Sequence, residues 1–112
     1  MEGRAQMNVQ FKKGVLELCV LALVAQRDRY GYELVERISR QIEIAEGTVY
    51  PLLRRLTDEG YFETYLQESA EGPPRKYYRI TALGRTTLTA LRQEWQIFAD
   101  GVSALLNEKG EV

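Results

Sequence analysis

The stretch EGTVYPLLRRLTDEGYFE, from Glu46 to Glu63, decides the fold of this chain. At about 100° per residue its apolar side chains fall on one narrow helical face. These side chains are Val49, Leu52, Leu53 and Leu56. Gly60 stands at the usual C-terminal position of a helix, and the residues after it alternate with the period of two that is typical of a strand. The stretch therefore predicts a helix over residues 45–59 that leads into a β-hairpin.

Pro51 makes the beginning of this helix irregular. A proline removes one backbone donor and restricts the residue before it, although the first turn of a helix tolerates it. We therefore expect the helix to start late or to be distorted near its N-terminus.

Two helices are predicted before this stretch and a hairpin after it. Apolar residues recur every three or four positions over residues 8–26 and again, after the sequence RDRYG, over residues 31–41. The hairpin has a first strand over residues 61–66, a polar tip over residues 67–74 and a return strand over residues 76–80.

Thr81 stands where an N-cap belongs and opens a final helix that ends near residue 107. The order helix, helix, helix, strand, strand, helix is that of a winged helix-turn-helix, in which the third helix enters the DNA major groove. The expected fold is therefore mainly α with a small β-hairpin. We expect a winged helix-turn-helix DNA-binding domain in residues 1–80 and a long C-terminal dimerisation helix in residues 81–112.

The composition excludes several classes of function. The 112 residues include no His and one Cys, so Ser-His-Asp or Cys-His catalysis is impossible and structural zinc is nearly excluded. The acids show no paired catalytic spacing, so we expect no enzyme, no metal site and no cofactor. Cys19 is interpreted as a buried hydrophobic residue, and a single thiol suits a reducing cytosol.

The apolar run over residues 18–25 is far shorter than the ~20 residues of a membrane helix, and the first residues lack the hydrophobic region of a secretory signal. We expect a cytoplasmic protein without membrane contact. The 15 Lys and Arg nearly balance the 16 Asp and Glu, so a nucleic-acid interpretation depends on where the charges lie.

The side of the third helix opposite its apolar face has the groups that DNA binding needs. Arginines bond guanine edges or phosphates, hydroxyls bond phosphates, and glycine permits close backbone approach. The candidate residues are Gly47, Thr48, Tyr50, Pro51, Arg54 and Arg55. The alternative is that the two arginines are solvated surface charges, paired with Asp58.

A second group of cations lies in the hairpin sequence GPPRKYYRI. We expect Arg75 and Lys76 to reach phosphates or the minor groove, whereas the alternative is that they protect an exposed edge strand. Arg79 is left open between the two faces of the strand. Lys12 and Lys13, in the first helix, are candidates for phosphate contacts or are ordinary surface residues.

The last helix has a heptad seam over about three heptads. Its positions are Gly84, Leu88, Leu91, Trp95, Phe98, Val102 and Leu105. Because a monomer would expose Trp95 and Phe98, we expect the seam from Leu88 to Leu105 to pair with a second copy. A two-fold dimer also suits a palindromic operator, because its reading helices meet half-sites about one helical turn apart.

Trp95 has two interpretations. In the first it packs in the dimer core. In the second, two symmetry-related Trp95 rings, with Phe98 nearby, hold a small aromatic ligand between them, and Glu94 and Asp100 attract its positive charge.

Three segments together resemble the PadR family of bacterial transcriptional regulators, namely RYGYELVERI, EGTVYPLLRRLTDEGYFE and GPPRKYYRITALG. The resemblance covers about residues 11–88. It implies a homodimeric winged-helix DNA-binding protein, most often a repressor, with an operator-reading region around residues 47–55 and wing contacts from Arg75 and Lys76. The single C-terminal helix matches the short subgroup, in which some members bind aromatic compounds through a Trp, a role that Trp95 would match.

Two hypotheses follow. The first is a dimeric repressor that a small aromatic effector releases from its operator. The alternative is a ligand-binding or protein-interaction module on a winged-helix scaffold that does not bind an operator. Salt-sensitive binding to promoter DNA distinguishes the two.

Overall fold

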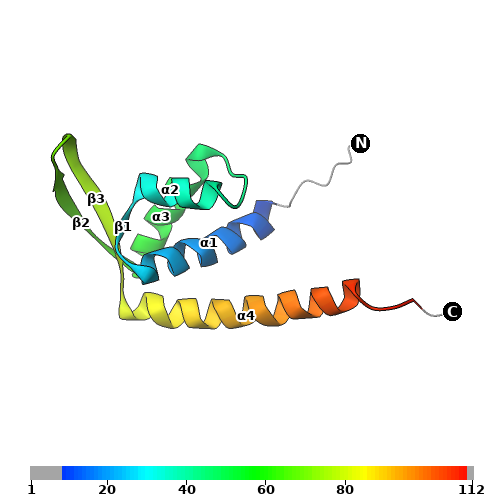
Figure 1. Ribbon diagram of the computed structural model, residues 1–112. Helices are drawn as coiled ribbons and strands as arrows, with labels where there is room; N and C mark the ends of the chain where they lie inside the picture. The colour runs from blue at the N-terminus through cyan, green and yellow to red at the C-terminus, as the bar shows by residue number, and fades with distance from the viewer. Residues whose placement is uncertain (1–8, 111–112) are drawn as a thin grey trace.

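The computed structural model describes residues 9–110, apart from the side chains of residues 9–12 and 46. Three helices form a cluster, from which a hairpin projects at one end, while a fourth and longer helix runs beside the first (Figure 1). The elements in chain order are α1 (Val9–Gln26), β1 (Arg29–Tyr30), α2 (Gly31–Ser39), the 3-10 helix η1 (Glu46–Thr48), α3 (Val49–Asp58), β2 (Phe62–Ser69), β3 (Gly72–Ile80) and α4 (Ala82–Leu106). The predicted winged-helix fold with a C-terminal helix is confirmed.

The core lies where α1, α2 and α3 meet the inner face of the sheet. The apolar face predicted for α3 is buried there, together with side chains from both other helices. The sheet adds Phe62, Tyr78 and Ile80 from alternate positions. The largest fully buried side chains are Leu16, Val20, Leu21, Val24, Leu34, Val49, Leu53 and Leu56.

The irregular start predicted for the third helix is confirmed. Residues 46–48 form a 3-10 turn, and α3 begins at Val49 with Pro51 in its first turn, where a missing N–H is tolerated. The helix ends at Asp58, and the predicted C-terminal glycine, Gly60, has a φ of 88° that favours glycine. The amides of Gly60 and Tyr61 donate to the carbonyls of Thr57 and Leu56, which closes the helix in a Schellman motif.

The sheet has a third strand that the sequence analysis missed. Its order is β1-β3-β2, all antiparallel, and β1 pairs Arg29 with Tyr78 and Tyr30 with Tyr77. A strand of two residues has no periodicity to detect, so the sequence predicts only a break between helices at RDRYG.

The predicted hairpin tip over residues 67–74 is wrong. The strands run to Ser69 and from Gly72, so only two residues remain between them. Pro73 and Pro74 lie inside β3. They are tolerated because β1 covers only the other end of β3, which leaves one edge of the strand unpaired at the prolines.

Helix α4 is attached tightly at its start. The Thr81 hydroxyl accepts a 3.0 Å hydrogen bond from the Gly84 amide, which confirms the predicted N-cap, and donates to the Gly60 carbonyl at 2.7 Å. A Cβ at Gly84 would lie 2.4 Å from the Tyr61 carbonyl oxygen, so only glycine permits this approach. The first part of α4 packs antiparallel to α1 (Figure 1).

None of the helices in residues 9–110 is long and apolar enough to cross a membrane.

Candidate nucleic-acid interface

The outward side of α3 and the turn before it present the predicted reading residues. Gly47, Tyr50, Pro51 and Arg54 are exposed, and Thr48 is half-buried. Because the opposite side of α3 is buried in the core, these groups lie on the one face of the helix that a duplex can reach.

A cleft of about 770 Å³, which we call the wing cleft, lies between this face of α3 and the hairpin. Three cations line it, Arg54 from α3 and Arg75 and Lys76 from β3, together with the acid Asp58. None of these cations forms an ion pair with an acid whose side chain the structure describes. The cleft therefore presents net positive charge beside the exposed face of α3.

Tyrosines and a helix N-terminus complete the wing cleft. Tyr30, Tyr32, Tyr50 and Tyr78 line it, and the first turn of α2 has no side-chain cap. Uncapped amides at a helix N-terminus favour an anion. Burial raises the pKa of Tyr78, and nearby Tyr50 adds to the rise while Arg54 opposes it. The Tyr78 hydroxyl is therefore protonated at neutral pH and can donate a hydrogen bond.

Gly31 allows Tyr50 to close one side of the wing cleft. A Cβ at Gly31 would lie 2.6 Å from Cε1 of the Tyr50 ring. Any larger residue at this position would displace the ring, because no real side chain accepts so short a contact.

Arg55 lies apart from the wing cleft. Its guanidinium donates at 2.8 Å to Glu17 of α1 and at 3.0 Å to Glu59. The hydrogen bond to Glu17 is the main reason why the pKa of Arg55 is raised. Arg55 thus connects α3 to α1 in the free protein, and its predicted assistance in operator reading stays a prediction.

Lys13 and Arg79 also lie outside the wing cleft. Lys13 lines a second hollow of about 350 Å³ on the other side of α3, with Thr48 and Pro51. The side chain of Lys12 lies outside the described residues. Arg79, whose face the sequence left open, lies 3.5 Å from the carboxylate of Asp28.

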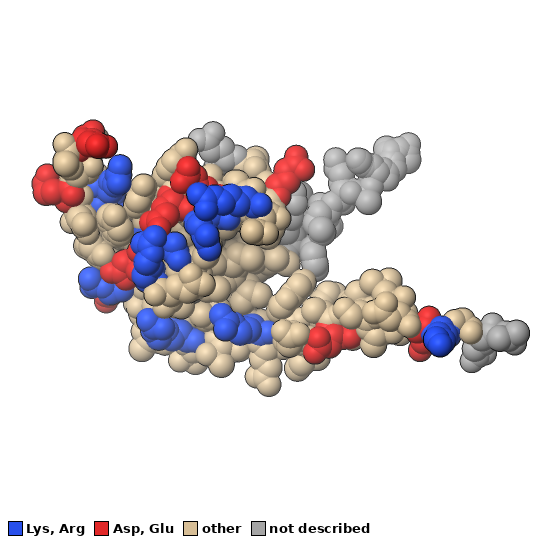
Figure 2. Space-filling model, viewed as in Figure 1, with Lys and Arg blue, Asp and Glu red and all other residues tan. Residues whose placement is uncertain are grey.

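The cations of the hairpin lie on its flank rather than at its free end. Arg75 pairs across the sheet with Gln67, and Lys76 pairs with Leu66. The end of the hairpin carries the exposed acids Glu68 and Glu71, and Figure 2 shows acidic side chains at this end. The flank is therefore the part of the hairpin suited to a phosphate.

The heptad seam of α4 divides into two parts. Gly84 and Leu88 are buried against the core of the chain, and Leu91 is half-buried. Beyond them, the seam side chains are open to solvent. Their exposed fractions are 39% for Trp95, 55% for Phe98, 39% for Val102 and 71% for Leu105.

Trp95 and Phe98 line a groove between α1 and α4, with a volume of about 510 Å³. Their ring centroids are 6.3 Å apart. Leu18 of α1 forms part of the opposite wall, and Glu94 also lines the groove. Asp100 does not line it and instead accepts a 2.9 Å hydrogen bond from Gln96.

A winged helix with a cation-lined cleft beside its third helix is an arrangement typical of transcriptional regulators. The PadR-like transcriptional regulator family matches residues 20–90, and the chain belongs to this family. The family and its structural relatives are transcriptional regulators, not enzymes.

Solved structures and a curated relative agree with this assignment. The chain is 39% identical to a PadR-like transcriptional regulator from Bacillus cereus, with a TM-score of 0.80 over 89% of this chain and 99% of that one. A Streptococcus transcriptional regulator is 35% identical, with a TM-score of 0.81 over 89% and 100%. A transcriptional regulator from Mycobacterium tuberculosis is 32% identical over 75% of this chain and 78% of its own length.

Of the four tyrosines that line the wing cleft, the sequence predicts a role for Tyr50 but not for the other three. Tyr30 and Tyr32 belong to the segment RYGYE, which contributed to the family resemblance without a role for either residue. Tyr78 lies in GPPRKYYRI, where only the basic residues are candidates for DNA contacts. The signal that could have found them is the clustering of tyrosines next to basic residues in two separate segments.

Proposed function

We propose that the protein is a homodimeric transcriptional regulator that binds a palindromic operator in double-stranded DNA. The observation that supports this most strongly is the wing cleft, where cations from α3 and β3 converge beside the exposed face of α3. In this proposal Tyr50, Pro51 and Arg54 face the major groove, and Arg75 and Lys76 bind phosphates of the flanking backbone.

The exposed half of α4 supports the dimer. A soluble chain rarely leaves an aromatic and aliphatic stripe such as Trp95, Phe98, Val102 and Leu105 open to solvent. We assign DNA binding to residues 1–80 and dimerisation to residues 81–112, in a cytoplasmic protein. Because Leu88 is buried in its own protomer, its role is to hold α4 in place for the interface.

The proposed effector is a small aromatic molecule. In this proposal the protein is a repressor, and binding of the effector releases it from its operator. The groove beside Trp95 and Phe98 supports this, because two copies that pair through α4 would bring two such grooves together. The dimer can adopt conformations that differ in the separation of the two α3 helices. A ligand that binds one of these conformations more tightly than another shifts the dimer toward it.

The DNA proposal is tested by fluorescence anisotropy with a labelled duplex from the region upstream of the gene that encodes this chain. Binding should weaken as salt rises, with a log–log slope of about −0.9 for each phosphate contacted. Arg54→Ala should weaken binding to this duplex, and a scrambled duplex of equal length is the control. Absence of salt-sensitive binding at modest salt would overturn the proposal.

Trp95 is the only tryptophan, so its fluorescence reports directly on the effector groove. Proflavine, a planar aromatic cation, should quench this fluorescence in a sample without DNA, because proflavine itself intercalates into a duplex. Quenching by proflavine in a protein that binds no duplex would instead support the alternative, a ligand-binding module on a winged-helix scaffold.

A further inference from the structure

Five side chains form a continuous row over the outer face of the sheet, away from the core. Arg75, Tyr77 and Arg79 occupy alternate positions of β3 and therefore share one face, opposite the buried Tyr78 and Ile80. The strand register places Tyr65 of β2 and Tyr30 of β1 on either side of Tyr77.

The members of this aromatic row are in direct contact. Tyr65 and Tyr77 stack with ring centroids 5.6 Å apart and an interplanar angle of 16°, and Tyr77 lies 5.4 Å from Tyr30. The guanidinium of Arg75 lies 4.6 Å from the centroid of Tyr30, and that of Arg79 lies 4.7 Å from the centroid of Tyr65. These separations are those of favourable aromatic and cation–π contacts. The row therefore ends in a cation on each side.

The end of the row at Tyr65 is tied to the helical core. The Tyr65 hydroxyl donates a 2.6 Å hydrogen bond to the carboxylate of Asp28, which also lies 3.5 Å from Nε of Arg79. Asp28 belongs to the link between α1 and β1, so its hydrogen bond with Tyr65 connects the hairpin to the helices.

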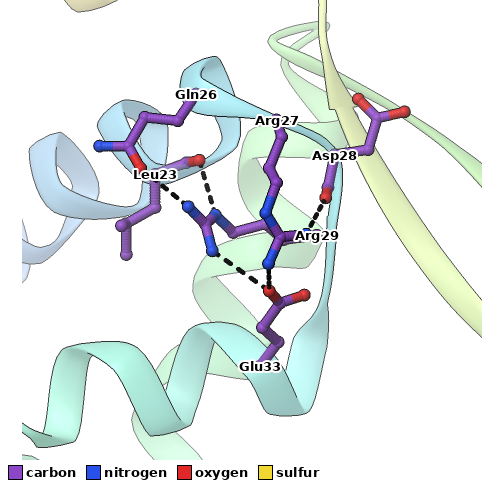
Figure 3. Close-up of polar contacts among 6 residues, drawn as sticks. All are labelled: Leu23, Gln26, Arg27, Asp28, Arg29 and Glu33. Atoms are coloured by element: carbon purple, nitrogen blue, oxygen red, sulfur yellow. Dashed lines mark hydrogen bonds and ion pairs between the residues drawn. The ribbon is translucent and has the colours of Figure 1, made fainter.

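Arg29 makes this link rigid. It is only 5% exposed, and its guanidinium donates to the Leu23 carbonyl and to Gln26 of α1, both at 2.8 Å, and to Glu33 of α2 at 3.2 Å (Figure 3). A buried guanidinium with three acceptors from two helices holds the backbone beside it in one position. Asp28 is thus a fixed anchor for the row.

The end of the row at Arg75 opens into the wing cleft, which Tyr30 also lines. We propose that Tyr30, Tyr65 and Tyr77 are positioning residues that hold Arg75 ready for a DNA phosphate, with Asp28 as their anchor. The proposal rests on the proposed DNA binding. A long side chain on an exposed strand loses rotamer freedom when it binds, and fixing it beforehand lowers that cost.

The test compares Arg75→Gln, Tyr77→Leu and the double variant in binding to a labelled 30-base-pair duplex of random sequence at low salt. Phosphate contacts do not depend on base sequence, so no operator is needed. Arg75→Gln should weaken binding about tenfold and lower the magnitude of the salt slope by about 0.9 per lost contact. Tyr77→Leu should weaken binding about threefold, and the double variant should match Arg75→Gln within about twofold.

Matched controls separate positioning from general loss of structure. Tyr77→Phe keeps the ring and should bind within about twofold of the unmodified protein. Thr64→Val, on the other face of β2, should change nothing. Tyr65→Phe keeps the row but removes the bond to Asp28, so it tests the anchor even if Tyr77→Leu fails to fold. Its effect should disappear when Arg75 is already Gln.

The inference would be overturned if Tyr77→Leu weakened duplex binding equally in the unmodified protein and in the Arg75→Gln variant. It would also be overturned if Tyr77→Leu did not weaken duplex binding at all. A second measurement is independent of DNA. In the free protein, the Arg75 Nε–H proton should resonate upfield because the guanidinium lies over the Tyr30 ring, and Tyr77→Leu should move the resonance toward the random-coil position. An unshifted resonance would overturn the inference, whereas a shifted resonance without duplex binding would overturn only the proposed function.

Discussion

Arg55 of α3 donates a 2.8 Å hydrogen bond to Glu17 of α1, while the adjacent Arg54 lines the wing cleft. Successive residues of a helix point about 100° apart, so two neighbouring arginines face different partners. One connects two helices of the core, and the other is available to a duplex. The sequence RR alone could not distinguish these tasks.

This difference predicts that alanine substitutions of the two arginines affect different properties of the protein. Arg55→Ala should lower the free energy of unfolding by about 1 kcal/mol, because it removes two partly exposed ion pairs. Arg54→Ala should change stability by less than about 0.5 kcal/mol but weaken DNA binding more than Arg55→Ala does. Urea unfolding and duplex anisotropy measure the two properties. The assignment is wrong if both substitutions affect both properties equally.

Gly84→Ala should destabilise the protein by about 2 kcal/mol. Its Cβ would lie 2.4 Å from the Tyr61 carbonyl oxygen and 2.7 Å from Ile80, so the start of α4 must move away from the sheet. Gly101→Ala in the same helix is the control. It meets nothing within 4 Å and should raise helix stability by up to about 1 kcal/mol. Chemical denaturation of both variants tests this, and similar midpoints would contradict it.

Val102→Glu should convert the proposed dimer into a monomer. The substitution places a charge in the exposed part of the α4 seam, and an unpaired charge buried in an apolar interface costs several kcal/mol. Gln93→Glu adds the same charge to the same helix outside the seam and should leave the dimer intact. Sedimentation equilibrium at micromolar concentration should find half the mass for Val102→Glu. A dimeric Val102→Glu variant would count against the proposed interface.

Cys19 should react slowly with alkylating reagents in the native protein. Burial raises the pKa of its thiol, and only the thiolate is nucleophilic. Because the native pKa lies above the unfolded one, this group does not reduce stability at neutral pH. The free energy of unfolding should decrease as pH rises above about 8.5, where the unfolded chain loses the proton first. Iodoacetamide labelling at pH 8 with and without urea measures the reactivity of Cys19. Equal labelling rates in the native and the unfolded protein would refute the prediction of slow reaction.

Local patterns were sufficient to predict the helices and the ends that their caps define. The apolar face of α3 needs only the spacing of Val49, Leu52, Leu53 and Leu56. The end of α3 depends on the backbone freedom of Gly60, and the start of α4 depends on the hydroxyl of Thr81. Such features involve residues within one or two turns of each other. The predicted reading residues on the outer side of α3 follow from the same periodicity.

The features that the sequence analysis missed depend on residues far apart in the chain. Strand β1 exists because Arg29 and Tyr30 meet Tyr78 and Tyr77, and the Pro-Pro pair is accommodated in β3 because of where β1 ends. The partner of Arg55 is Glu17, and the anchor of Tyr65 is Asp28. No local spacing encodes these pairs, because each forms only once the core has packed and brought two distant segments together.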